Sequence, residues 1–129
     1  MIFVDTNVFM YHVGAEHPLQ DQARGFFRDA RLRNLRLVTS VEVLQEILHR
    51  YVKLGRRGTA SAAFALVDGS VSEVWPVERV DLELARGLAD RYPGLEARDL
   101  VHLACCIRHK PRDLMTFDRG LAAAWEARR

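Results

Sequence analysis

The first residues of the chain place an apolar run directly before an acid: residues 1–4 read MIFV, and Asp5 follows. Apolar residues at helical spacing begin at once, with Val8 and Phe9. An apolar run this short is typical of a strand that is buried on both faces, as in a parallel sheet. Ligands of such sheets bind at the carboxyl ends of the strands. The sequence therefore predicts an α/β fold in which Asp5 lies at the ligand-binding edge.

The same arrangement recurs near the C-terminus, where residues 114–117 read LMTF and lead into Asp118. If both segments are strands of one parallel sheet, their two carboxylates lie at the same edge. Carboxylate oxygens are the ligands that Mg²⁺ and Mn²⁺ prefer. The two segments together indicate a metal site.

Strand-like and helix-like segments alternate along the whole chain. We expect strands over 2–5, 35–38, 71–77 and 114–116. We expect helices over 7–13, 19–33, 41–54, 59–68, 80–91, 97–109 and 119–128. Thr39 or Ser40 is suited to cap the helix that starts at 41, and Pro76 places the third strand near a sheet edge. The pattern predicts a single three-layer α/β domain over 1–129, with a central parallel sheet of four to five strands flanked by helices.

The composition is that of a globular domain, with 49% apolar and 28% charged residues. No apolar run approaches the roughly 20 residues of a membrane span, and the N-terminal run lacks the basic flank of a signal peptide. The two cysteines, Cys105 and Cys106, are adjacent, so we expect no disulfide framework. These features favour a cytoplasmic protein. The net charge of +2 favours no particular class of partner.

Each acid of interest, taken alone, has an ordinary structural explanation. Asp5, Asp99 and Asp118 lie at or near predicted helix starts, where a carboxylate caps a helix or interacts with its dipole. Glu46 falls inside a predicted helix, where a lone Glu is usually solvated. Several acids in one crevice, however, repel one another unless a cation neutralises them. The combination therefore predicts a divalent metal ion.

Four short motifs occur in order along the chain. They are VDTN at 4–7, Ser40 followed by Glu46, ARD at 97–99 and TFD at 116–118. In residue type and spacing they resemble the motifs of PIN domains, and most closely those of VapC-type toxins, the ribonuclease halves of toxin–antitoxin pairs. The resemblance covers the whole chain in order and spacing. It departs from the family after the last helix, where many members have a further edge strand.

The resemblance implies a PIN-like fold and a function. The family's metal-binding and catalytic acids correspond to Asp5, Glu46, Asp99 and Asp118. The implied activity is RNA cleavage that depends on Mg²⁺ or Mn²⁺, and the implied partners are a second copy in a homodimer and a cognate VapB-like antitoxin that blocks the site. A metal held by these acids would lower the pKa of a bound water and supply hydroxide for in-line attack on a phosphodiester.

Other polar residues near these motifs are candidates for supporting roles. Asn7 and Thr116 are suited to hydrogen bonds that orient the acids, although capping and turn formation explain them equally well. The densest basic stretch is 49–57, and its cations are also favoured simply because they end a helix. Its candidates for contact with an RNA backbone are Arg50, Lys53, Arg56 and Arg57.

A second constellation has zinc-ligand residue types. His102, Cys105, Cys106 and His109 fall on one face of the predicted helix over 97–109. One straight helix cannot surround an ion with four tetrahedral ligands. We therefore interpret the cysteines as small apolar residues of the core.

Two other functions stay open at this point. A strand that ends in Asp also suits a phosphatase of the haloacid-dehalogenase type or a phospho-accepting receiver. The phosphatase pattern has a second Asp where Asn7 stands, and both have a lysine near the C-terminal strands, for which Lys110 is the only candidate. The other function is a PIN-like RNA-binding module without activity, against which the presence of all four acids argues.

Overall fold

The structure is a computed structural model, and it describes residues 1–128. Strands and helices alternate along these residues, as the sequence predicts. The strands are β1 (Ile2–Val4), β2 (Leu37–Ser40), β3 (Glu73–Trp75) and β4 (Asp113–Met115). The helices are α1 (Thr6–Val13), α2 (Gln20–Leu32), α3 (Val41–Lys53), α4 (Arg57–Ser70), α5 (Arg79–Arg91), α6 (Ala97–His109) and α7 (Arg119–Ala127).

The four strands form one parallel sheet in the order β3-β2-β1-β4. In this order β1 is central, and its Phe3 pairs with Val38 of β2 on one side and with Leu114 of β4 on the other. The prediction of a parallel sheet is confirmed, with four strands in the described part of the chain. The strand before Pro76 lies at a sheet edge, as predicted.

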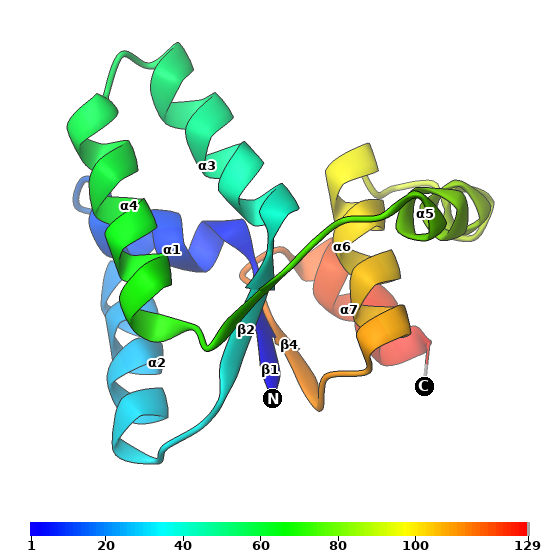
Figure 1. The fold of residues 1–129 in the computed structure, drawn as a ribbon, viewed down its shortest axis with the longest axis horizontal. Coiled ribbons are helices and arrows are strands. Elements are labelled where there is room, and N and C mark those ends of the chain that lie inside the picture. The colour runs from blue at the N-terminus through cyan, green and yellow to red at the C-terminus, as the bar shows by residue number, and fades with distance from the viewer. Residues whose placement is uncertain (129) are drawn as a thin grey trace.

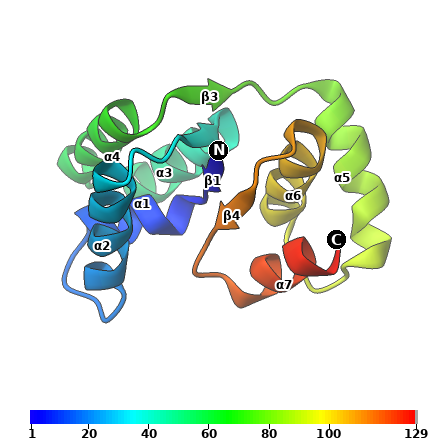
Figure 2. The same cartoon turned by 90° about the horizontal axis from the view of Figure 1, so that it is seen from below.

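Helices cover both faces of the sheet, which confirms the three-layer architecture. Helices α1 to α4 lie on one side and α5 to α7 on the other (Figures 1 and 2). The chain first runs outward from β1 to β2 and β3, and it then returns to place β4 on the far side of β1. Because parallel crossovers are right-handed, this reversal moves the connecting helices to the opposite face. The reversal creates a switch point beside β1, and ligands of open α/β sheets bind there.

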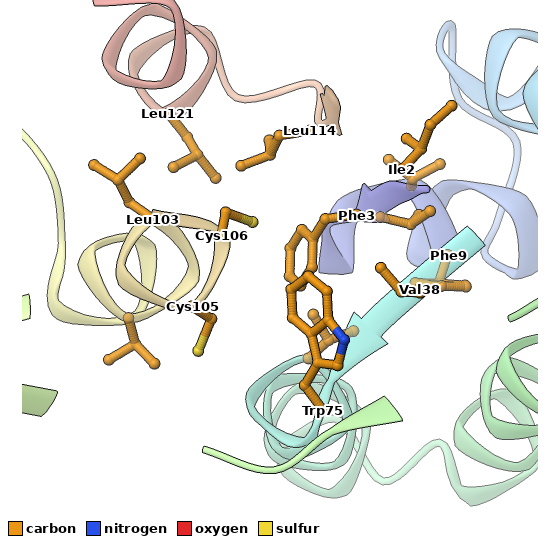
Figure 3. Packing of buried hydrophobic residues seen from close by; sticks show 14 of the residues in the cluster. Ile2, Phe3, Phe9, Val38, Trp75, Leu103, Cys105, Cys106, Leu114 and Leu121 are labelled. Atoms are coloured by element: carbon orange, nitrogen blue, oxygen red, sulfur yellow. The ribbon is translucent and has the colours of Figure 1, made fainter. Parts of the chain in front are cut away.

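The core lies between the sheet and both helical layers. Phe3 of β1 is fully buried and stacks on Trp75 of β3, with ring centroids 5.5 Å apart (Figure 3). Cys105 and Cys106 are free thiols of α6 and lie fully inside this core. Because these cysteines and Phe3 are buried in the same hydrophobic core, α6 packs in one core with β1.

The structure corrects several predicted boundaries. The second strand covers Leu37–Ser40 and not 35–38, and no cap hydrogen bond to α3 comes from the side chain of Ser40. Thr39 is a strand residue whose buried hydroxyl donates to the carbonyl of Val4 on β1 (2.8 Å), so it does not cap α3. In addition, α4 is longer than 59–68, β3 is shorter than 71–77 and β4 ends one residue before Thr116. Several other ends shift by a single residue, and β1 ends at Val4 and not at Asp5.

No helix in residues 1–128 is both long enough and apolar enough to cross a membrane.

Candidate active site

Asp5 lies where β1 ends and α1 begins, and it is almost completely buried. Its Oδ1 accepts a hydrogen bond from the backbone N–H of Thr6 (2.7 Å), so Asp5 is the N-cap of α1. Its Oδ2 accepts from the hydroxyl of Thr116 (2.7 Å) and from the Asn7 side-chain amide (3.4 Å). These bonds fix the direction in which the carboxylate faces.

The segment that follows β4 is tied to Asp5 through the same small network. The Thr116 hydroxyl, which donates to Asp5, also accepts from the backbone N–H of Asp118 (2.9 Å). The side-chain oxygen of Asn7 accepts from the backbone N–H of Phe117 (3.1 Å). The orienting hydrogen bonds from Asn7 and Thr116 to Asp5 are thus present in the fold, while their role toward a metal stays a prediction.

Asp118 lies beyond β4, and the predicted strand over 114–116 is shifted by one residue to Asp113–Met115. The strand ends at Met115, and Asp118 is the N-cap of α7, where its Oδ1 accepts from the N–H of Leu121 (2.9 Å). Thr116, the residue directly after β4, donates its hydroxyl to Asp5. Asp118 still reaches the carboxyl edge of the sheet.

The remaining two acids come from helices. Asp99 lies in the first turn of α6, and Glu46 lies in α3 with its side chain only 13% exposed. Glu46 is therefore mostly buried, whereas a lone Glu inside a helix is usually solvated. All four acids line one cleft of about 580 Å³ at the carboxyl edge of the sheet, beside the switch point.

His102 also belongs to this site, although the sequence pattern groups it with the zinc-ligand residue types Cys105, Cys106 and His109. It lies one turn after Asp99 on α6 and is fully buried. Its Nε2 is 2.5 Å from Oε1 of Glu46 and 3.4 Å from Oδ1 of Asp5. The signal that could have found it is its spacing of three residues from Asp99, which places both on one helical face.

The charges in the cleft strongly perturb one another. Burial raises the pKa of Asp99 to about 6, and the neighbouring charges of Asp118 and Asp5 add to the effect. Burial alone would lower the pKa of His102, but the carboxylates of Asp5 and Glu46 outweigh it and raise this pKa. Negative charge is therefore concentrated at the base of the cleft.

Basic side chains line the same cleft as the acids. They are Arg50, Lys53 and Arg98, and His49 lies beside them in the lining. Of the predicted RNA contacts, Arg50 and Lys53 thus reach the cleft, and Arg56 lines an adjoining pocket that it shares with Arg50. Arg57 lies at the start of α4, outside the residues that line either pocket.

The sequence relatives place the chain in a class. The family model of the PIN domain matches residues 2–125. Ribonuclease VapC23 of Mycobacterium tuberculosis is 51% identical over 127 residues, which cover 98% of this chain and 100% of that protein. Ribonuclease VapC13 of the same organism is 48% identical over 120 residues, which cover 93% of this chain and 92% of that protein. The chain therefore belongs to the PIN-domain family and, within it, to the VapC ribonucleases.

Solved structures show the same fold. The toxin VapC20 of M. tuberculosis, described as cleaving the sarcin–ricin loop, superposes with a TM-score of 0.77 at 24% identity, covering 96% of this chain and 95% of that one. FitAcB from Neisseria gonorrhoeae superposes with a TM-score of 0.68 at 17% identity, covering 98% of this chain and 94% of that one. The predicted PIN-like architecture and the resemblance to VapC-type toxins are confirmed.

Nucleases of this family depend on a divalent metal ion, and the donor chemistry of the cleft fits one. Four carboxylates line it, and their crowding contributes to the raised pKa of Asp99. Among residues 1–128, no three His, Cys, Asp or Glu side chains already form a common ligand set. Mg²⁺ usually keeps several waters and takes only one or two carboxylates directly, so it does not require such a set. The cleft therefore suits a hydrated divalent ion.

Proposed function

We propose that this protein is the toxin of a VapBC-type toxin–antitoxin pair and an endoribonuclease that requires Mg²⁺ or Mn²⁺. The observation that carries the proposal is the cleft itself. It gathers Asp5, Glu46, Asp99 and Asp118 from four separate parts of the fold at the switch point of the sheet. A carboxylate cluster of this kind is suited to bind a hard cation, and a basic rim is suited to bind the phosphates of RNA.

In this proposal the four acids hold a hydrated metal ion, in part through its waters, and the basic residues Arg50 and Lys53 of the cleft bind the substrate. The bound ion supplies a water of lowered pKa and offsets negative charge on the phosphate under attack. Asp5 is oriented from both of its oxygens by Thr6, Asn7 and Thr116, so its direction is set before any ligand arrives. Arg50 and Lys53 lie where they can pair with phosphates that flank the scissile bond.

Cleavage of a labelled single-stranded RNA tests the proposal. We expect cleavage with Mg²⁺ or Mn²⁺ and none in excess chelator, and we expect Asp5→Asn and Asp99→Asn to abolish it because each removes a metal-binding charge. Asp90→Asn is the matched control, since Asp90 is an exposed acid of α5 that does not line the cleft.

Two additional measurements separate the proposal from its alternatives. A phosphatase of the haloacid-dehalogenase type would hydrolyse a phosphomonoester such as p-nitrophenyl phosphate and leave RNA intact. An inactive binding module would bind RNA but would cleave neither RNA nor the phosphomonoester. This outcome would hold whether or not calorimetry shows that the module binds Mn²⁺. Full cleavage of RNA in excess chelator would contradict the metal mechanism.

The partners follow from the same site. We propose a cognate antitoxin whose cationic side chain enters the acidic cleft, where it competes with metal and substrate. The toxin–antitoxin complex from Klebsiella pneumoniae, which superposes with a TM-score of 0.65, shares the fold at 15% identity. We further propose that the single domain forms a homodimer and that it acts in the cytoplasm. Exposed apolar side chains of α3, including Leu48 and Val52, offer surface for such an assembly.

A further inference from the structure

A single buried imidazole joins two of the acids that come from different elements. His102 of α6 lies within 2.5 Å of Glu46 of α3 and within 3.4 Å of Asp5 at the end of β1. Its side chain is 0% exposed, so it reaches neither solvent nor substrate. We propose that His102 is a positioning residue that aims the carboxylate of Glu46 into the metal-binding cleft. This inference rests on the proposed function and adds a residue that acts through Glu46.

The contacts of the imidazole show which of its two nitrogens faces the carboxylates. Nε2 faces the two carboxylates, whereas Nδ1 is buried and has no hydrogen-bond partner among the described residues. A proton on Nε2 can be donated to Glu46, and the ring packs against Phe3 at 5.7 Å between centroids. A neutral ring with its only proton on Nδ1 would instead leave a buried donor unsatisfied and set a lone pair against two carboxylates. We therefore expect a proton on Nε2 that His102 donates to Glu46.

Glu46 depends on such a partner more than Asp5 and Asp118 do. Asp5 is held by three protein hydrogen bonds, and Asp118 is held as the N-cap of α7. The hydrogen bond to His102 engages Oε1 of Glu46 and leaves Oε2 for the cleft that this residue lines. Without His102, the long side chain of Glu46 is free to rotate away from Asp5, because two carboxylates repel each other.

Two substitutions of His102 separate positioning from packing. His102→Phe keeps a ring against Phe3 and removes the donor, whereas His102→Gln keeps an N–H donor near the position of Nε2. We expect the Phe variant to bind Mn²⁺ about 10–100-fold more weakly, as is typical when a ligand loses its outer hydrogen bond. We expect kcat to fall with little change in KM for RNA, and the Gln variant to recover a large part of both losses.

His109→Phe is the matched control. His109 lies two turns later on α6 and stacks on Trp75 at 4.1 Å, so the substitution removes another largely buried imidazole from the same helix but away from the cleft. Calorimetry with Mn²⁺ alone and RNA cleavage are measured for all three variants. Affinity and kcat of His102→Phe within twofold of wild type would overturn the inference, as would an equal loss in His109→Phe.

The wild-type protein provides a test that does not depend on any variant folding. Nitrogen-15 NMR of the imidazole side chains reports which ring nitrogen carries the proton, and we expect Nε2 of His102 to carry it. A neutral ring protonated on Nδ1 would overturn the inference. Wild-type protein that neither binds Mn²⁺ nor cleaves RNA would instead refute the proposed function, and the NMR result would still decide whether His102 donates to Glu46.

Discussion

At the scale of a single residue, Asp99 shows how the acidic cleft lowers the stability of the metal-free fold. It is a partly buried acid beside Asp118 and Asp5, and these surroundings raise its pKa from 3.8 to about 6. Between these two values the folded protein binds the proton more tightly than the unfolded chain does. The free energy of unfolding therefore falls as the pH rises from 4 to 6 and stays low above 6. The charge that serves the proposed metal site thus destabilises the metal-free fold.

The first prediction concerns Asp99→Asn in the absence of metal. At pH 7.5 in chelator we expect the variant to be more stable than wild type by about 1–2 kcal/mol, less than the full pKa shift would give, because water screens the charge of this partly exposed side chain. The difference should shrink as the pH falls toward 4.5, because wild-type Asp99 then becomes protonated. Urea unfolding at several pH values measures this, with Asp90→Asn as the control. A difference that does not change with pH would contradict the assignment of the effect to Asp99.

At this scale, sequence reasoning found the acids and two of the side chains that hold Asp5, but it did not find the partner of Glu46. Asp5 and Asp118 are recognisable because each ends an apolar run, and Asp99 because it opens an apolar helix. His102 was considered only beside Cys105 in a zinc pattern, since a histidine on an apolar helix face gives no sign of its partner. Its partner Glu46 comes from a helix more than fifty residues away, and only the packing of α3 against α6 brings the two together.

At the scale of elements, the junction of β1 and β2 sets the position of Asp5. The buried hydroxyl of Thr39 on β2 donates to the carbonyl of Val4, the residue directly before Asp5. Thr6, directly after Asp5, is also buried, but its hydroxyl has no hydrogen-bond partner among the described residues. The two buried threonines therefore differ in hydrogen bonding. The hydroxyl of Thr39 donates to a carbonyl, and that of Thr6 has no partner among the described residues.

This difference gives a second prediction, on stability. Thr39→Val keeps the shape of the side chain and removes a used donor, so we expect a loss of about 1–2 kcal/mol. Thr6→Val removes an unpartnered polar group from a buried position, so we expect no loss or a gain in stability. Denaturant unfolding in chelator measures both variants side by side. Equal destabilisation by the two substitutions would show that the Thr39 hydrogen bond does not hold β1 to β2.

The elements themselves were largely predictable, and the errors have a common cause. Apolar periodicity located the helices of the described residues and their alternation with strands, because helices and a doubly covered sheet leave strong patterns. The order of the strands within the sheet was not predicted, apart from the edge position of β3. The end of β2 was missed because Thr39 and Ser40 are polar and are typical of helix caps, yet both are buried. Nothing in the local sequence reveals that the hydroxyl of Thr39 is satisfied by a strand from the start of the chain.

At the scale of the whole molecule, the proposed partners make a third prediction. Expression of this chain alone should slow growth, and coexpression with the neighbouring small gene should restore growth and yield a joint complex without RNA cleavage. The physical reason is competition of a cationic side chain with the metal in the cleft. Light scattering should give a dimer for the chain alone and a larger assembly with the antitoxin. A harmless chain that is monomeric at micromolar concentration and ignores that neighbour would contradict the toxin assignment.

The central place of β1 also has a consequence for the timing of synthesis. β1 is paired on one side with β4, which follows it at a long distance in the sequence and is therefore made much later (Figure 1). Asp118, which completes the acidic cleft, follows β4 and caps the final helix. A growing chain on the ribosome therefore carries Asp5 without the strand and the acid that complete its surroundings until β4 and Asp118 have been made. The complete cleft is delayed by the synthesis of all the elements between β1 and α7, which leaves an interval in which the antitoxin that we propose can already be present.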